Sequence, residues 1–156
     1  MRFFRFFALW AALLLVLTGC GGSPPQPQLQ INHPAIPTPS TGMSILFGQV
    51  VGSNSNTPIK KTPIYLAQIH WDAEHKNAAY AFDISRGPAT TTDQNGFFVF
   101  TELPPNEYAL IVGDFYGRND VVRESNGNAR IYQPEAGKSV DVGVVQVNPA
   151  VETQRG

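Results

Sequence analysis

Residues 92–100 read Thr-Asp-Gln-Asn-Gly-Phe-Phe-Val-Phe, and residues 102–110 continue as Glu-Leu-Pro-Pro-Asn-Glu-Tyr-Ala-Leu. The Asp-Gln-Asn-Gly segment is typical of a tight turn, because Asn and Gly tolerate the backbone that such a turn requires. The aromatic run after it favours a β-strand, and Pro-Pro-Asn favours a second turn before another apolar run. The stretch therefore predicts a turn, a strand, a corner and a second strand.

Alternation along these two strands predicts which side chains enter the core. Successive side chains of a strand point to opposite faces. We therefore expect Phe98 and Phe100 to face the core, together with Tyr108, Leu110 and Val112.

The opposite faces of the same strands carry Phe97, Val99 and Ile111, which are also apolar. Either a loop covers these residues, or they form a contact surface, since sizeable exposed apolar patches usually mark interaction sites. Both alternatives stay open at this stage. With Trp71 and Tyr80, these three residues are the candidate contact residues of the domain.

Strand-like segments separated by turn signals recur from residue 44 to residue 147. Seven or eight of them, with the segment at 130–132 weak, occur within about 105 residues, and no segment keeps a helical period for three turns. The pattern predicts an all-β domain, a β-sandwich. The expected strands are 44–51, 63–69, 79–84, 89–92, 97–101, 108–112, 130–132 and 140–147.

Length and composition narrow the class of protein further. The chain has 156 residues, which favours one domain once non-folding segments are removed. Charged residues make up 15% and the formal net charge is −1, whereas a nucleic-acid binder usually shows a basic patch or stripe. We expect no nucleic-acid partner.

Residues 1–20 read MRFFRFFALWAALLLVLTGC. Two arginines precede an apolar core of about a dozen residues, the length of a signal-peptide core and short for a membrane span. Leu-Thr-Gly-Cys at 17–20 resembles the lipobox of bacterial lipoproteins, which implies cleavage between Gly19 and Cys20 and a lipid on Cys20. The alternatives are an ordinary secretory signal with an incidental cysteine, and an uncleaved N-terminal helix.

The lipid on Cys20 would be the membrane anchor, since each buried methylene contributes about 0.8 kcal/mol. Gly21 follows the cysteine, whereas lipoproteins kept in the inner membrane of Gram-negative bacteria commonly carry Asp there. The resemblance therefore implies a protein anchored to the cell membrane or the outer membrane, facing the extracytoplasmic side.

A proline-rich segment joins the cysteine to the domain. It contains six prolines and few charges, which excludes a helix or an inner strand. An extended spacer of about 20 residues, at about 3.1 Å each, reaches roughly 60 Å from the bilayer. The expected organisation is a signal peptide at 1–19, the lipidated cysteine and tether at 20–41, the sandwich at 42–150 and a tail at 151–156.

Four motifs stand between about residues 45 and 115: Gly48-Gln49-Val50, Pro58-Ile59, the hairpin at 93–100 and the corner at 103–108. With these motifs the domain resembles the carboxypeptidase regulatory-like domain. The resemblance implies a seven-stranded, prealbumin-like Greek-key β-sandwich. Asn106 stands where that family usually has Gly, and Asn tolerates a left-handed backbone nearly as well, so we expect the corner to persist. The family is an accessory module, so the resemblance says more about fold than about function.

The chain is also similar to the intradiol ring-cleaving dioxygenases, whose non-haem iron is held by two Tyr and two His. Tyr80 and Tyr108 fall near the positions of those tyrosines, but no histidine follows Tyr108, where that family has a His-x-His pair. Half of the ligand set is absent, so we expect no iron site of this type. The expectation is a non-enzyme with no cofactor other than the lipid. The histidines of the chain are His33, His70 and His75.

Two further clusters of side chains are open to more than one reading. A group near residue 72 could bind a divalent metal, but a solvated loop explains it as well, and we expect no metal. An aromatic group could form a platform for a sugar ring or a peptide, although such side chains more often cover a core. The first group is His70, Asp72, Glu74 and His75; the second is Trp71, Tyr80, Phe115 and Tyr116.

Together these features predict a membrane-anchored, non-catalytic binding or assembly module of the cell envelope. Its expected partner is an envelope protein or a polysaccharide, met through a sheet edge or an apolar face. The alternatives are a purely structural knob of a surface complex and a degenerate dioxygenase-like enzyme.

Overall fold

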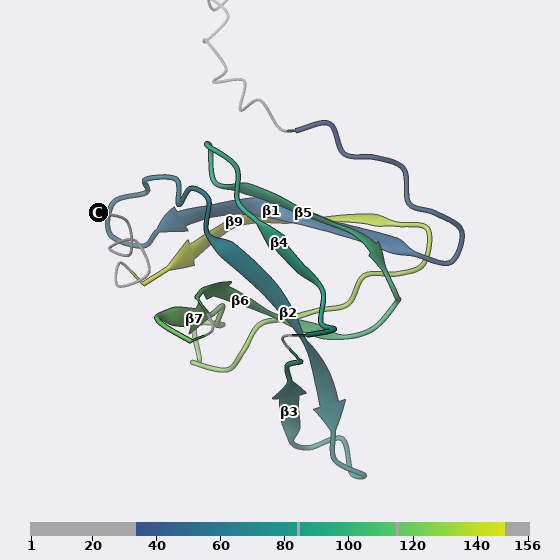
Figure 1. Ribbon diagram of the computed structural model, residues 1–156. Helices are drawn as coiled ribbons and strands as arrows, with labels where there is room; N and C mark the ends of the chain where they lie inside the picture. The colour runs from purple at the N-terminus through teal and green to yellow at the C-terminus, as the bar shows by residue number, and fades with distance from the viewer. Residues whose placement is uncertain (1–33, 84, 115, 149–156) are drawn as a thin grey trace, which may run out of the picture. The chain divides into compact units, whose positions relative to one another are not determined.

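The computed structural model describes residues 34–148, apart from residues 84 and 115 (Figure 1). The elements in this part are all β-strands, and it contains no helix long and apolar enough to cross a membrane. Gly19, Cys20 and the expected tail at 151–156 lie outside the described residues.

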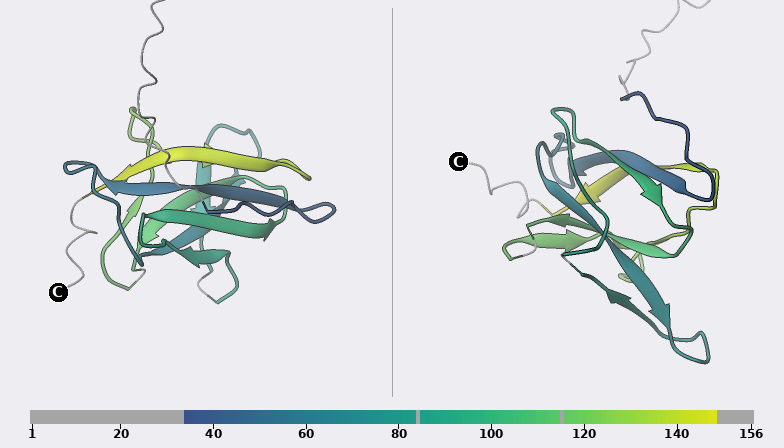
Figure 2. Two further views of the ribbon diagram at one scale, coloured as in Figure 1. Left: turned by 90° about the horizontal axis from the view of Figure 1, so that it is seen from above. Right: turned by 45° about the vertical axis from the view of Figure 1, so that its right-hand side comes forward.

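The described strands form two sheets, a three-stranded sheet A in the order β5-β1-β9 and a six-stranded sheet B. Figure 2 shows β9, β1 and β5 of sheet A side by side when the molecule is seen from above. Sheet A contains β1 (Ser44–Gly52), β5 (Phe97–Leu103) and β9 (Ser139–Val147). Sheet B contains β2 (Pro63–Trp71), β3 (Ala78–Ala81), β4 (Ala89–Thr91), β6 (Tyr108–Gly113), β7 (Asn119–Val121) and β8 (Ile131–Tyr132).

The two sheets pack as a β-sandwich, which confirms the predicted fold class. In sheet B, β3 and β4 pair with different halves of β2, while β7 and β8 pair with different halves of β6. The described strands therefore occupy about seven positions, three in sheet A and four in sheet B, as the sequence suggested. The sequence missed β7, whose residues Asn-Asp-Val are too short to show alternation.

The core between the sheets contains the residues that alternation assigned to it. Phe98, Phe100, Tyr108, Leu110 and Val112 are each 4% exposed or less and belong to one hydrophobic cluster. The rings of Phe98 and Phe100 meet edge to face, with their centroids 5.9 Å apart. The prediction for these five residues is confirmed.

The turn before β5 is held by Asp93. Its Oδ1 accepts the backbone N–H groups of Asn95 at 2.7 Å and Phe97 at 2.9 Å. Gly96 has a φ of 78°, and a Cβ there would lie 2.5 Å from the carbonyl oxygen of Val50. Glycine is thus required both for the backbone conformation and for the close approach to β1.

The corner between β5 and β6 differs from the expectation in its detail. Asn106 does not adopt the left-handed backbone that we expected; instead its Oδ1 accepts the N–H of Glu107 at 2.8 Å. The hydroxyl of Tyr108 donates to the carbonyl of Pro104 at 2.9 Å, and burial raises the pKa of this phenol. Near this corner, Glu102 at the end of β5 adopts the left-handed backbone instead of Asn106, with a φ of 56°.

Glu102 belongs to a β-bulge in β5. Ser44 pairs with Leu103 and Leu46 pairs with Phe100, so two residues of β5 stand opposite one residue of β1. The carboxylate of Glu102 accepts a hydrogen bond from the hydroxyl of Ser40 at 2.7 Å. Residues 34–41 form no strand, and Pro34, Ile36 and Pro39 are partly buried.

The expectation that Phe97, Val99 and Ile111 share one face is wrong. Phe97 and Val99 belong to β5 in sheet A, while Ile111 belongs to β6 in sheet B. Phe97 and Ile111 are only 3% and 4% exposed, and Val99 is half-buried. The sequence left open whether these residues are covered or form an exposed contact surface. Phe97 and Ile111 are covered.

Candidate functional site

The β2–β3 hairpin extends beyond the rest of the sandwich and presents two different faces (Figures 1 and 2). Leu66, on β2, faces the core between the sheets, while Ala67 and Ile69 face the outer side of sheet B. By alternation, Gln68 and His70 share the side of Leu66. A hollow lies on each side of β2 at this end.

The hollow on the outer side, which we call the outer groove, has a volume of about 550 Å³. Its walls come from the β2–β3 hairpin and from the connection between β7 and β8. Such a volume lies within the range of small-molecule and cofactor sites. The lining residues that matter most are Ile69, Trp71, Lys76, Tyr80, Arg123 and Asn128.

The indole of Trp71 is held from two sides. Its Nε1–H donates to a carboxylate oxygen of Glu107, which precedes β6. The ring of His75 stacks on the indole, with centroids 5.6 Å apart and an angle of 10° between the planes. These two contacts fix the indole beside the groove.

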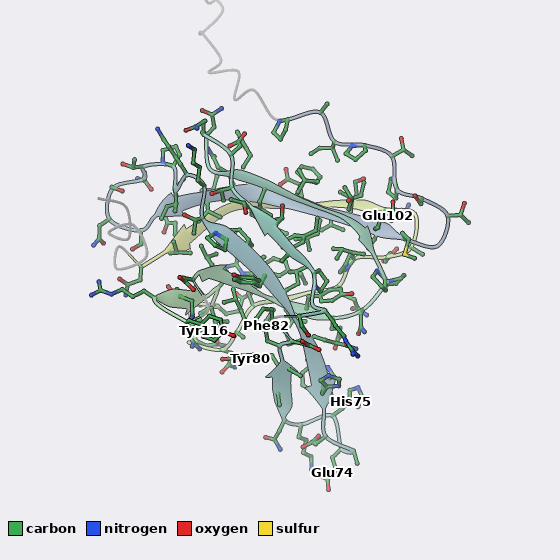
Figure 3. The ribbon with its side chains drawn as sticks, viewed as in Figure 1. Glu74, His75, Tyr80, Phe82, Glu102 and Tyr116 are labelled. Carbon is green, nitrogen blue, oxygen red and sulfur yellow. The ribbon has the colours of Figure 1, made fainter. Side chains whose placement is uncertain are left out.

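Tyr80 stands next to Trp71 on the same face. Ile69 pairs with Tyr80 and Trp71 pairs with Ala78, so Trp71 and Tyr80 are diagonal neighbours across β2 and β3. Tyr80 is 46% exposed. Figure 3 shows Tyr80 and Phe82 close to the sheet, while Glu74 lies at the tip of the hairpin.

The opposite wall of the groove is a polar turn. The guanidinium of Arg123 donates from Nη1 to the carbonyl of Gly127 at 2.9 Å. The N–H of Asn128 donates to Oδ1 of Asn126 at 2.9 Å, and Arg123 and Ala129 form an isolated β-bridge. The turn therefore presents to the groove the amide of Asn128 and the guanidinium of Arg123, of which one nitrogen already donates within the turn.

The lining combines aromatic rings with planar polar groups and cations. Trp and Tyr offer an apolar face with a polar edge, and Asn and Arg offer several donors in a fixed geometry. Lys76 and Arg123 are the charged residues of the described lining, although Lys76 is 2.7 Å from the carboxylate of Glu74. The groove is suited to a ligand that has flat apolar faces, hydroxyl groups and negative charge.

The second hollow, which we call the inner cleft, lies on the other side of β2 and has a volume of about 620 Å³. Apolar residues of the core form its floor, and polar side chains form its rim. Asp83 is at this rim, and its carboxylate accepts the hydroxyl of Ser85 at 2.6 Å, which lowers the pKa of Asp83. The other rim residues are Gln68, His70, Arg86, Glu102 and Asn106.

The structure separates the two tyrosines that the sequence related to an iron site. Tyr80 pairs with Ile69 and lines the outer groove, while Tyr108 pairs with Gln68 and lines the inner cleft. Adjacent residues of β2 point to opposite faces, so these two phenols cannot hold one ion.

The candidate metal group is also divided. His70 lines the inner cleft, while Asp72 accepts the N–H groups of Lys76 at 2.8 Å and Asn77 at 3.1 Å inside the hairpin turn. Hydrogen bonds lower the pKa of Asp72, and the largest contribution comes from the backbone N–H of Lys76. Within residues 34–148, less 84 and 115, no three His, Cys, Asp or Glu residues are placed to hold a metal ion.

The aromatic platform forms only in part. Trp71 and Tyr80 come together in the outer groove, whereas Tyr116 is 88% exposed and does not line it, and Phe115 lies outside the described residues. The sequence missed Arg123 and Asn128. The turn signal Ser-Asn-Gly at 125–127, between two short apolar pairs, would have indicated a hairpin there.

The chain matches no protein-family model and no curated protein. Among solved structures it has a distant likeness to proteins of several different kinds. The major pilin subunit of Bacillus cereus aligns at 14% identity and a TM-score of 0.41, over 72% of this chain and 31% of the pilin. The chain thus spans about a third of that pilin subunit.

Two other solved structures align over a similar share of this chain. A proposed carbohydrate-binding protein of Pseudomonas aeruginosa aligns at 16% identity and a TM-score of 0.43, over 73% of this chain and 99% of that protein. Catechol 1,2-dioxygenase of an Acinetobacter species aligns at 13% identity and a TM-score of 0.36, over 76% of this chain and 57% of the enzyme.

Proposed function

We propose that this chain is a lipid-anchored, non-catalytic binding module of the cell envelope, and that its outer groove holds an anionic polysaccharide. The observation that carries the proposal is the meeting of Trp71 and Tyr80 with the cations Lys76 and Arg123 in one groove. A purely structural role would not need this combination.

The aromatic side of the groove suits a sugar ring. A pyranose presents C–H groups on its flat faces and hydroxyls at its edge, and an indole or phenol face packs against the C–H groups. Trp71 is already fixed by Glu107 and His75, so little side-chain freedom is lost when a ring binds. Asn128 on the facing wall offers an amide to the hydroxyls.

The charge of the groove suits an acidic glycan. Lys76 and Arg123 line it, and the described lining includes no Asp or Glu. A guanidinium can donate two parallel hydrogen bonds to a carboxylate or phosphate, which gives geometric selection as well as attraction. Because both cations are exposed, added salt should weaken the binding.

The composition of the groove favours binding over catalysis. Glycoside hydrolysis normally uses a pair of carboxylates on the two sides of the scissile bond. The described lining has neither carboxylate nor imidazole; the carboxylate of Glu107, which stands behind Trp71, accepts the indole N–H. The proposal therefore assigns retention of the glycan to this module and no chemical step.

The lipid and the tether would display the groove at the membrane surface. Residues 34–41 precede β1, Pro34, Ile36 and Pro39 are partly buried, and the hydroxyl of Ser40 donates to Glu102, so a spacer between lipid and domain would consist of residues 21–33. About 13 extended residues at about 3.1 Å each span about 40 Å. This reach of about 40 Å is shorter than the roughly 60 Å expected from a tether of about 20 residues.

The test uses the full-length lipoprotein in detergent on an array of neutral and acidic envelope polysaccharides. We expect binding to acidic members, a loss of at least about tenfold for Trp71→Ala and Arg123→Gln, and weaker binding at high salt. Tyr116→Ala and Lys138→Gln are the matched controls, since both residues are exposed and lie outside the groove. Each variant is first checked for an unchanged melting temperature.

Two results would contradict the proposal. One is the absence of binding to any acidic polysaccharide while the wild-type chain is folded. The other is binding that the two groove variants leave unchanged, which would place the contact elsewhere on the molecule.

A further inference from the structure

The sequence contains two Asn-Gly pairs, Asn95-Gly96 and Asn126-Gly127, and each lies in a turn. In such a pair the backbone nitrogen of the glycine can attack the side-chain amide carbon of the asparagine, because glycine has no side chain to block the approach. The attack needs a solvent-accessible glycine N–H and a backbone that can bend toward the asparagine side chain. The two pairs have the same sequence, so the surroundings of each turn decide which of them can react.

The turn at 93–96 is held against β1. The carbonyl of Asn95 accepts Nε2 of Gln49 at 2.8 Å, and the carbonyl of Gly96 accepts the N–H of Val50 at 2.8 Å. Gly96 is buried, and a Cβ there would lie 2.5 Å from the carbonyl oxygen of Val50. Attack at this pair therefore requires the turn to leave β1 first.

The second turn, in the connection between β7 and β8, is open. Residues 123–128 are all exposed, and a Cβ at Gly127 would meet nothing within 4 Å. Its hydrogen bonds close within the turn: the N–H of Glu124 donates to the carbonyl of Asn128 at 2.8 Å, and the guanidinium of Arg123 donates to the carbonyl of Gly127 at 2.9 Å. The backbone here can bend without separating two strands of the sandwich.

The side chain of Asn126 is already turned toward the backbone with which it would react. Its Oδ1 accepts the N–H of Asn128 at 2.9 Å, so the side chain curls over the intervening Gly127. The same bond polarises the amide carbonyl and stabilises negative charge on Oδ1 as the nitrogen adds. The N–H of Gly127 must first leave the carbonyl of Glu124, but the turn at 93–96 has an equivalent bond, so this requirement does not separate the two pairs.

We infer that Asn126 is a site of spontaneous deamidation, through a cyclic imide formed with the backbone nitrogen of Gly127. That nitrogen loses its proton to solvent base and forms a bond to Cγ of Asn126, and the side-chain nitrogen takes up a proton and leaves as ammonia. Water then opens the ring at one of its two carbonyls, which gives isoaspartate or aspartate. Ammonia leaves and water enters, so the reaction requires no oxidant, reductant or enzyme.

The product carries a carboxylate beside the outer groove. The reaction replaces a neutral amide by a negative charge, next to the Gly127 carbonyl that accepts the guanidinium of Arg123. Arg123 is one of the two cations of the described groove lining. The consequence for binding rests on the proposed function: the new carboxylate competes with an acidic glycan for this guanidinium, so the modified chain binds the glycan more weakly.

The test follows both pairs in one sample. The full-length lipoprotein in detergent is incubated in mildly alkaline buffer, with and without guanidinium chloride, and the peptides that contain Asn95 and Asn126 are followed by mass spectrometry. Deamidation raises the mass by the difference between water and ammonia, and methylation by an isoaspartate methyltransferase identifies isoaspartate. Asn126→Gln is the control for the assignment, because it should remove the reaction at this position and leave Asn95 as in the wild type.

The denatured chain serves as the reference. In guanidinium chloride, where neither turn is formed, we expect the two pairs to react at similar rates. In the native chain we expect Asn126 to react at least about tenfold faster than Asn95, which corresponds to about 1.4 kcal/mol for releasing the turn at 93–96 from β1.

Two variants test the effect on the groove. Asn126→Asp imitates the aspartate product, and Asn95→Asp adds the same charge outside the groove. We expect binding of an acidic polysaccharide to be about twofold to fivefold weaker for Asn126→Asp and unchanged for Asn95→Asp. The reaction rates are measured without any glycan, so failure of the glycan groove and failure of the deamidation site are distinguishable.

The inference is overturned if the native chain modifies Asn95 as fast as Asn126. It is also overturned if the native chain leaves Asn126 unmodified under conditions in which the denatured chain reacts at both pairs. Equal weakening of glycan binding by Asn126→Asp and Asn95→Asp would contradict the effect at the groove, since it would show a response to net charge alone.

Discussion

Trp71 of β2 and Glu107, the residue before β6, are joined across neighbouring strands by a hydrogen bond from the indole N–H to the carboxylate. The backbone N–H of Ile69 donates to the backbone carbonyl of the same Glu107 at 2.9 Å, so Trp71 stands two residues beyond the level of Glu107 and the two side chains meet diagonally. Together with the stacking on His75, this bond holds an aromatic ring beside the turn of the projecting hairpin.

Replacing Glu107 with Ala should free the indole of Trp71. We expect a loss of about 1 kcal/mol in the free energy of unfolding, because the lost bond involves a charged acceptor that is only partly buried. If the lipobox is cleaved, Trp71 is the sole tryptophan of the mature chain, and its fluorescence should shift to longer wavelength. An unchanged emission spectrum would mean that the bond does not hold the ring.

The two Asn-Gly turns of the chain should respond differently to alanine. Gly96 and Gly127 both have left-handed φ values, of 78° and 87°, but a Cβ at Gly96 would lie 2.5 Å from a backbone oxygen and one at Gly127 would meet nothing within 4 Å. Gly127→Ala should cost about 1–2 kcal/mol, the strain of the left-handed backbone. Gly96→Ala should cost more than about 3 kcal/mol, because the strands must also move apart.

Urea unfolding of the two glycine variants measures the difference directly. Similar midpoints would show that the contact between the 93–96 turn and β1 can relax without cost. Gly127 is the matched control, since both glycines follow an asparagine in a turn.

The tip of the β2–β3 hairpin should loosen in acid. Hydrogen bonds from Lys76 and Asn77 lower the pKa of Asp72 below its usual 3.8. A carboxylate with a depressed folded-state pKa contributes stability above its unfolded pKa, and this contribution is lost as the pH falls through the folded pKa. The hairpin tip should therefore be intact above about pH 5 and loosen well below pH 4.

Amide hydrogen exchange at Lys76 and Asn77 tests this prediction. We expect faster exchange at low pH, relative to the intrinsic rate, in the wild type and at all pH values in Asp72→Ala. If protection at these two amides is the same at pH 7 and pH 2.5, the carboxylate does not hold the turn.

Changing Cys20 to Ser should abolish labelling by a palmitate analogue in cells. The lipobox resemblance makes Cys20 the acceptor of the lipid, and it is the one cysteine of the sequence. The variant should also leave the membrane fraction or remain there only through an uncleaved signal peptide, which a mass shift of the chain reveals. Persistent labelling of the Ser variant would refute the lipobox.

The sequence predicted the core correctly where one strand carried all the needed information. Phe98 and Phe100 enter the core because alternation is a property of the strand itself, and the Asp93–Gly96 turn fixes where the strand begins. The opposite face could not be predicted in the same way. Phe97 and Ile111 are buried from that side, and they belong to different sheets, which no local pattern records.

The sequence predicted one wall of the outer groove and missed the other. Trp71 and Tyr80 lie nine residues apart in one hairpin, so their proximity follows from a local pairing. Arg123 and Asn128 come from a connection about 50 residues later, and only the pairing of β7 and β8 with β6 brings that connection to the hairpin. When two residues are brought together by several successive strand pairings, no fixed spacing in the sequence indicates that they are close.

The sequence by itself determined the strand content, the inward residues of the main strands and the glycine in the 93–96 turn, because each follows from backbone geometry over a few residues. The tertiary structure decided which apolar faces are covered, that Tyr80 and Tyr108 point to opposite sides of sheet B, and which of the two Asn-Gly turns packs against another strand. Those properties depend on which distant segments pack together, and packing is settled by the whole chain at once.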